Sequence, residues 1–348
     1  MFLKRNRIII VALLIVQSCA YNEHKTVEEQ VLSEFSRIDR IEILEQVTND
    51  CLEDIWGMVA YSPFLFAYGN SLSGNQVSVT DYSQNNITTS YFVSKGRAKG
   101  ETSHVSGIQA TCDSLFVCVD PWTIWGYSIN DVKTKNYLPK IAYEAEPLAQ
   151  SIVRIDGPGF LYIRRNIEDP NNSTIYKKIN KNIASSFGEF EQMDVSFPND
   201  DESKHTAWQG KIITSPNLKN ALCLFSYAIG FDLINVSSEK ITRKMWDVPR
   251  VSIQPIPQLK INMVRPQEDF SPIFKDCCAS NDFVYLLGKT NKLGCIVLKY
   301  NWNGDPISIS KLPKEIDIIG IAVEENDRNV YLAIRESQGN RIVRYANK

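Results

Sequence analysis

The most regular feature of the hydrophobic pattern is a short run of apolar and aromatic residues that recurs six times. Each run has the composition of a buried strand and is followed by a turn and a second strand. The runs are residues 65–68, 116–119, 161–164, 224–227, 284–287 and 330–333. Between the second residues of successive runs the spacings are 51, 45, 63, 60 and 46 residues, the period of propeller blades. The pattern predicts an all-β chain folded as a six-bladed β-propeller.

The last predicted blade has one strand too few. It offers strands at residues 318–323, 330–334 and 341–345, where a blade is expected to have four. Residues 38–44 show the apolar alternation of a strand. We expect this N-terminal strand to close the last blade, because closure removes exposed sheet edges.

The two longest spacings require insertions between blades. One lies at residues 187–209, an acidic segment that contains His205 and Trp208, and the other at residues 249–272, which are rich in proline. Insertions in propellers usually extend loops on one face of the ring, often the face that binds a partner.

The first nineteen residues indicate an export signal. Basic residues at positions 4, 5 and 7 precede an apolar run at residues 8–16, which is too short to cross a bilayer as a permanent helix. The residues before Cys19 then resemble a bacterial lipobox, in which the cysteine becomes the lipid-modified N-terminus. An ordinary secretory signal with an incidental cysteine is the alternative. We predict a lipoprotein signal peptide at residues 1–18, lipidated Cys19 with a tether through residue 36, and the propeller at residues 37–348.

Lipidation of Cys19 makes a membrane the first expected partner. Each buried CH₂ of an acyl chain contributes about 0.8 kcal/mol, so several chains on one residue anchor a domain stably. Ala20 follows the cysteine and favours the outer membrane, by analogy with bacterial sorting rules. Periplasmic and surface exposure both stay open.

Composition agrees with an exported globular protein. Hydrophobic residues make up 43% of the chain, and no further long apolar run follows the export signal. The formal net charge is −2, with Lys and Arg dispersed among Asp and Glu. A nucleic-acid partner is therefore not expected.

Seven cysteines follow Cys19, an odd number that cannot all pair within one molecule. Their irregular spacing lacks the paired blocks of a zinc site. Cys118 and Cys223 fall inside predicted strands, where a cysteine behaves as a small buried hydrophobe. We expect mostly free, structural thiols, with one disulfide as the alternative.

Several segments resemble the TolB-like six-bladed propeller lipoproteins of gut anaerobes. Besides the lipobox cysteine, the similar segments are residues 208–212, 215–217, 221–236, 297–306, 321–324, 330–333 and 342–345. The resemblance covers nearly the whole chain after Cys19, and it implies the same fold and an anchored place in the cell envelope. That family has no settled biochemical activity, so the resemblance implies no reaction.

Motifs for catalysis or metal binding are weak. The sequence has no G-x-S-x-G elbow, no H-E-x-x-H and no P-loop. It contains three histidines, and a metal centre would have to combine His104 with His205 from distant blades. We predict no catalytic residue, no metal and no cofactor.

Aromatic and cationic residues are better candidates for binding. Trp122 and Trp208 could stack on a sugar or a peptide, and Trp208 with His205 lies beside the long insertion. Arg164 and Arg165 follow a predicted strand and could present a guanidinium to a carboxylate or phosphate. For the tryptophans the alternative is packing between blades, and for the arginines it is a salt bridge between blades.

These observations favour a non-catalytic, lipid-anchored binding or assembly module for an envelope protein or glycan. The alternative is a propeller enzyme of the sugar lactonase or lyase type, with its site in the axial funnel. A lactonase-like site needs Glu, Asn and Asp side chains that converge on a divalent ion. The predicted innermost strands offer mainly apolar residues, Ser and Arg.

Overall fold

The computed structural model describes residues 25–40, 43–48, 52–83, 87–119, 123–144, 151–163, 174–181, 183–189, 206–256, 261–337 and 339–346. The chain divides into two compact units, Met1–Glu34 and Phe35–Lys348. In the first unit, helix α2 (Val27–Ser33) begins with a capping box. The Thr26 hydroxyl accepts from the amide of Glu29 at 3.2 Å, and the Glu29 carboxylate accepts from the amide of Thr26 at 3.0 Å.

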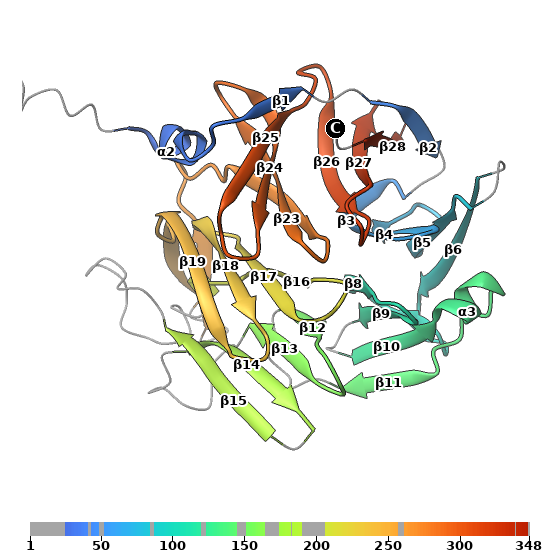
Figure 1. Ribbon diagram of the computed structural model, residues 1–348. Helices are drawn as coiled ribbons and strands as arrows, with labels where there is room; N and C mark the ends of the chain where they lie inside the picture. Colours follow the sequence, from blue (N-terminus) through green and yellow to red (C-terminus); the bar gives the residue numbers. More distant parts are fainter. Residues whose placement is uncertain are drawn as a thin grey trace, which may run out of the picture. The chain divides into compact units, whose positions relative to one another are not determined.

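The second unit is a six-bladed β-propeller (Figure 1). Blade one contains β3 (Asp54–Tyr61), β4 (Phe64–Asn70), β5 (Asn75–Asp81), β6 (Thr88–Lys95) and β7 (Glu101–Thr102). Blade two contains β8 (Val105–Ala110), β9 (Ser114–Val119), β10 (Thr123–Ser128), the short helix α3 (Ile129–Lys133) and β11 (Ile141–Glu144). Blade three contains β12 (Ile152–Arg154), β13 (Phe160–Ile163), β14 (Thr174–Asn180) and β15 (Ile183–Glu189).

The remaining blades complete the ring. Blade four contains β16 (Gly210–Thr214), β17 (Asn220–Phe225), β18 (Ile229–Asn235) and β19 (Lys240–Asp247). Blade five contains β22 (Phe274–Ala279), β23 (Phe283–Thr290), β24 (Gly294–Asn301) and β25 (Pro306–Lys311). Blade six contains β26 (Asp317–Val323), β27 (Asn329–Glu336) and β28 (Gly339–Ala346). The first strands of successive blades contact one another around the ring, so they line its axis.

The hydrophobic core lies between the blades. Because each blade is covered on both faces by its neighbours, the second strands β4, β17 and β27 are buried along most of their length. Separate clusters fill the spaces between blades one and two, three and four, five and six, and six and one. The apolar runs of the sequence are therefore the second strands of the blades, which neighbouring blades cover on both faces. Their recurrence predicted the fold correctly.

The ring is closed by an N-terminal strand, as predicted, but the residues differ. Strand β2 (Glu45–Thr48), not residues 38–44, pairs antiparallel with β28 and gives blade six its fourth strand. Strand β1 (Ile38–Arg40) pairs parallel with β25 and becomes a fifth strand of blade five. The N-terminal segment thus binds the outer edges of two adjacent blades.

Burial separates the roles of these two strands. Val47 of β2 is 5% exposed and packs with residues of blades six and one, whereas Ile38 of β1 is 57% exposed. We expect Val47→Thr to lower the free energy of unfolding by about 1–3 kcal/mol, because it buries a hydroxyl group without a partner. The same change at exposed Ile38 is expected to stay within about 0.5 kcal/mol. Equal losses in urea unfolding would contradict the assignment of the closing role to β2.

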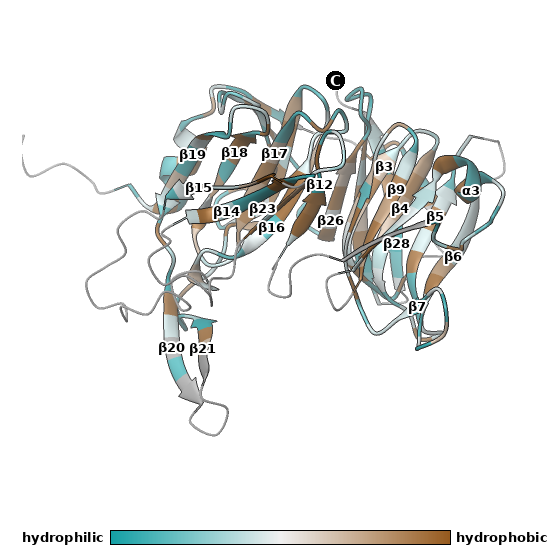
Figure 2. Ribbon diagram, turned by 90° about the horizontal axis from the view of Figure 1, so that it is seen from below, coloured by the Kyte–Doolittle hydropathy of each residue, from teal (hydrophilic) through white to brown (hydrophobic). Residues whose placement is uncertain are grey.

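The insertion at residues 249–272 forms a hairpin between blades four and five. Its strands β20 (Val251–Ile256) and β21 (Ile261–Pro266) pair only with each other within the described residues. Val251 and Val264 at its base are 8% and 9% exposed and join the core. Beyond this base the two strands stand out from the ring (Figure 2).

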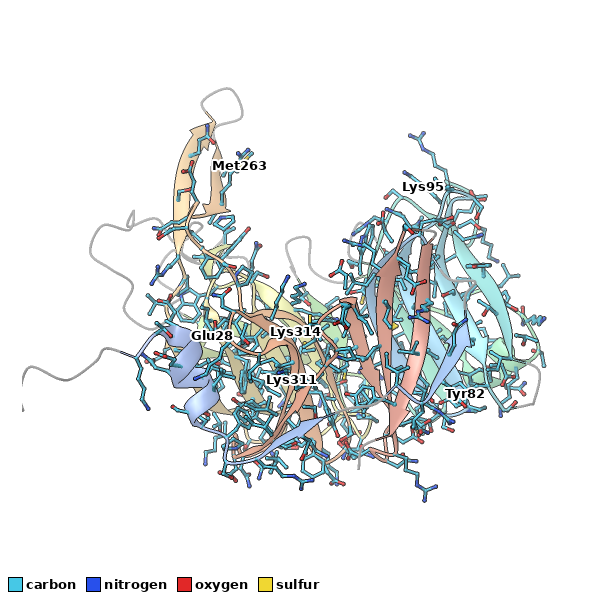
Figure 3. The ribbon with its side chains drawn as sticks, turned by 90° about the horizontal axis from the view of Figure 1, so that it is seen from above. Glu28, Tyr82, Lys95, Met263, Lys311 and Lys314 are labelled. Atoms are coloured by element: carbon cyan, nitrogen blue, oxygen red, sulfur yellow. The ribbon has the colours of Figure 1, made fainter. Side chains whose placement is uncertain are left out.

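The hairpin lies at the end of the ring where the first strands of the blades begin, and the other insertion belongs to the same kind of connection. Each connects the last strand of one blade to the first strand of the next. We call this end the insertion face. Met263 of the hairpin and Lys95 at the end of β6 both lie on it (Figure 3). The other insertion begins within β15, and its residues 190–205 lie outside the described part of the chain.

Candidate functional site

A small cavity lies on the axis of the ring. Most of its lining residues come from the first strands of the six blades, β3, β8, β12, β16, β22 and β26, and Tyr68 of β4 and Cys118 of β9 also contribute. Its volume is about 80 Å³, which is room for a few water molecules.

An ion pair stands beside this cavity. The ammonium group of Lys211 on β16 contacts Oδ1 of Asp276 on β22, and the amide of Ile321 on β26 donates to Oδ2 of Asp276 at 3.0 Å. The Asp276 side chain is 4% exposed. Burial alone would lower the pKa of Lys211, but the charge and hydrogen bond of Asp276, together with Tyr68 and Cys277 nearby, outweigh burial and raise that pKa above its ordinary value. Blades four, five and six are joined by this pair.

Blade one leaves space for the same lysine. A Cβ atom at Gly57 of β3 would lie 3.0 Å from Nζ of Lys211 and 2.6 Å from a ring carbon of Tyr68. Blades one and four are opposite in a ring of six, so the Lys211 side chain crosses the axis. The absence of a side chain at position 57 leaves room for the Tyr68 ring and for the end of the Lys211 side chain.

Other polar side chains join neighbouring blades at their first strands. Gln109 on β8 accepts from the amide of Arg154 at 2.8 Å, and its own amide group donates to the Arg154 carbonyl at 2.9 Å. The hydroxyl of Ser151 accepts from the amide of Ile212 at 3.1 Å. Blades two, three and four are held together by these bonds.

The position of Trp208 differs from its expected role as a binding residue. It is fully buried, packs edge-on against Phe225 with ring centroids 5.0 Å apart, and belongs to the core of blades three and four. The Arg243 guanidinium lies 5.0 Å from its ring centroid and forms two 2.8 Å bonds to the carboxylate of buried Asp232. Trp208 is thus a packing residue and not an exposed contact for a partner, because the chain turns inward before β16.

The remaining predicted site residues are outside the described ranges. They are Cys19, Trp122, Arg164, Arg165 and His205.

A larger cleft opens at the opposite end of the ring from the insertion face. It is formed by the turns that join the first and second strands of blades two, three and four, and we call it the turn cleft. Its volume is about 710 Å³, within the range of small-ligand sites. Its lining includes residues 111–114, 156–158 and 216–218, with Phe116, Ile124, Arg154, Phe160 and Lys181.

Both signs of charge line the turn cleft. The Arg154 guanidinium lies over the rings of Phe116 and Phe160, 5.8 and 5.0 Å from their centroids, and exposed Lys181 adds a second cation. Two exposed carboxylates face the same space. Asp113 accepts from the hydroxyl of Thr111 at 3.3 Å, and Asp156 accepts from the amide of Gly157 at 2.8 Å.

The cysteines in the described ranges are free, as the sequence predicted. Cys118 and Cys223 are buried within strands, and burial raises the pKa of Cys118 to about 12. Cys277 is also buried, with its pKa raised to about 12 by burial. Among these cysteines only Cys112, which lines the turn cleft, is exposed.

The described residues contain neither a metal-binding cluster nor a membrane-spanning helix. No group of three or more His, Cys, Asp or Glu side chains in these ranges is placed to hold a metal ion. Nor does any helix in those ranges have the length and apolar character needed to span a bilayer.

Two solved structures are similar to this chain at low sequence identity. No family model and no curated protein matches the sequence. A Bacteroides fragilis NCTC 9343 protein, whose name describes it as exported, superposes with a TM-score of 0.53 at 10% identity, over 90% of this chain and 99% of that chain. The β-propeller domain of Cps50 (Swd1) from Myceliophteria thermophila gives a TM-score of 0.47 at 9% identity, over 88% of this chain and 100% of that domain. The chain is a six-bladed β-propeller.

Proposed function

We propose that the protein is a lipid-anchored binding or assembly module of the cell envelope, similar to the TolB-like propeller lipoproteins. Cys19 carries the lipid, most simply in the outer membrane, and the propeller recognises a partner protein through its insertion face.

The observation that carries this proposal is that the axis of the ring holds a neutralised ion pair and only a small cavity. Lys211 and Asp276 neutralise each other there, and the cavity beside them is about 80 Å³. A sugar substrate needs more room, so the axis is better suited to holding the blades together than to catalysis. The hairpin β20–β21, by contrast, extends outward from the insertion face (Figure 2).

The hairpin favours a protein partner. A two-stranded hairpin is marginally stable in water unless something covers it. Among the side chains described in this hairpin, Val251 and Val264 at its base pack in the core, and Ser252, Gln254 and Arg265 are exposed. The hairpin therefore gains stability when a partner protein packs on it. The exported neighbour among solved structures and the lipobox-like sequence support an envelope location.

The anchor is tested by changing the cysteine. We expect Cys19→Ala to move the protein from the membrane fraction to the soluble fraction and to abolish labelling by a fatty-acid analogue, because the thiol that carries the lipid is gone. Cys112→Ala should change neither property. Continued lipid labelling of the Cys19 variant would contradict the anchor.

Partner binding is tested by shortening the hairpin. Replacing residues 255–262 by an Asn-Gly turn keeps the pair Gln254–Met263 and the packed base. With a photo-crosslinking residue at exposed Ser252, the full-length hairpin should give one discrete protein adduct in cells, and the shortened hairpin should lose it while its melting temperature stays unchanged. The same probe at exposed Arg328, in the turn between β26 and β27, is the control. Identical adducts from both positions would contradict the proposal.

A further inference from the structure

The turn cleft is a second candidate site, distinct from the insertion face. Three successive blades contribute a turn to it, so its shape depends on the assembled ring and not on a single loop. The Phe116 side chain is partly exposed in the cleft, while Ile124 and Phe160 are buried beneath it. The cleft therefore has an apolar floor within a polar rim.

The charges of the cleft limit what it can hold. An organic anion alone would be repelled by Asp113 and Asp156, and a cation alone would be repelled by Arg154 and Lys181. A ligand that carries both charges can pair with both sets. Apolar side chains on such a ligand would cover the floor, which adds about 25 cal/mol for each Å² removed from water.

We propose that the turn cleft binds short peptides with free ends, holding the terminal carboxylate near Lys181 and Arg154 and the terminal ammonium near Asp113 and Asp156. This inference rests on the proposed function, since it gives the binding module a small ligand in addition to its partner. A peptide fits better than a sugar, because the floor is apolar and its two phenylalanine rings are covered in part by Arg154.

The rate at which Cys112 is alkylated can report peptide binding in the turn cleft. It is the exposed thiol among the described cysteines, and it lines the cleft next to Asp113. A bound peptide should shield it from alkylation. Peptide mapping by mass spectrometry follows the alkylation of Cys112 separately from that of every other cysteine in the full-length, detergent-solubilised protein.

The probe is a tetrapeptide of alternating leucine and alanine with both ends free. We expect it to slow alkylation of Cys112 at millimolar concentration. Its N-acetylated and C-amidated forms should each need about tenfold more peptide, because each has lost one charge-assisted contact. Lys181→Glu should weaken protection by the free peptide about tenfold, and Asp113→Asn should weaken it in the same direction.

Lys135→Glu is the matched control. Lys135 and Lys181 are both exposed lysines in turns, with φ of 55° and 56°, but Lys135 lies outside the cleft. In the Lys135→Glu variant, the free peptide should protect Cys112 as well as it does in the wild type. No shielding by the free peptide, equal shielding by the capped peptides, or equal loss in both lysine variants would each overturn the proposal. The hairpin and the anchor are unchanged in these variants. A negative result would therefore contradict peptide binding in the turn cleft and would not contradict the proposed function, which the Cys19 and hairpin variants test.

Discussion

Trp208→Ala is expected to lower the free energy of unfolding by about 3–5 kcal/mol, because it leaves a large cavity in the core between blades three and four. The side chain is 0% exposed, and its ring is flanked by Phe225 and by the guanidinium of Arg243. Removing the ring also takes away the surface on which that guanidinium lies. Urea unfolding of the propeller, followed by circular dichroism, measures the loss.

The matched control is the same substitution at Trp56. Trp56 is 40% exposed and touches the ring of His104, with centroids 4.9 Å apart. Trp56→Ala is expected to cost less than about 1 kcal/mol, since Trp56 is 40% exposed and water can fill the space that its side chain leaves. If Trp208→Ala were as mild as Trp56→Ala, the tryptophan would not be packed as described, and a role in binding would become open again.

The sequence predicts the fold well because a propeller repeats its local pattern. Each blade needs a central strand that is buried on both faces, and such strands appear as uninterrupted apolar runs. Turn chemistry is equally local: Gly304, in the Asn-Gly turn between β24 and β25, has a φ of +87°. The period of the runs then gives the number of blades.

Closure of the ring is less local and was predicted only in outline. Residues 38–44 and β2 are both short, partly polar segments, so alternation alone does not decide which of them pairs with β28. Two contacts decide which segment closes the blade. Val47 is buried between blades six and one, and β1 pairs in parallel with β25. Both depend on contacts with residues more than 250 positions away.

The candidate sites are harder to predict for the same reason. Lys211 and Asp276 are 65 residues apart in sequence, and only the ring brings them together. Gly57 is a signal of this close approach, but a glycine in a strand also marks a bulge or a tight bend, and the register of β3 does shift between Ile55 and Gly57. The turn cleft combines three short turns whose sequences contain no motif. Trp208 was misplaced because it follows a long polar insertion, although the chain has already returned to the core at that point.

Lys211→Met is expected to cost about 3–5 kcal/mol, because it removes the partner of the buried Asp276 carboxylate and leaves that charge without compensation. Asp276 would then keep a single bond at 3.0 Å, from the amide of Ile321, at a side chain that is 4% exposed. An exposed pair provides the control: Arg335→Met removes a partner of Asp317, where the side chains are 57% and 51% exposed, and should cost less than about 1 kcal/mol.

A double variant separates the loss of charge balance from the loss of packing. Asp276→Asn keeps an oxygen that can accept from the amide of Ile321 and removes the charge that Lys211 neutralises. Lys211→Met combined with Asp276→Asn should therefore be more stable in urea than Lys211→Met alone, since no unpaired carboxylate remains on the axis. If the double variant were less stable than the single one, the loss in Lys211→Met would not come from an unpaired carboxylate at Asp276.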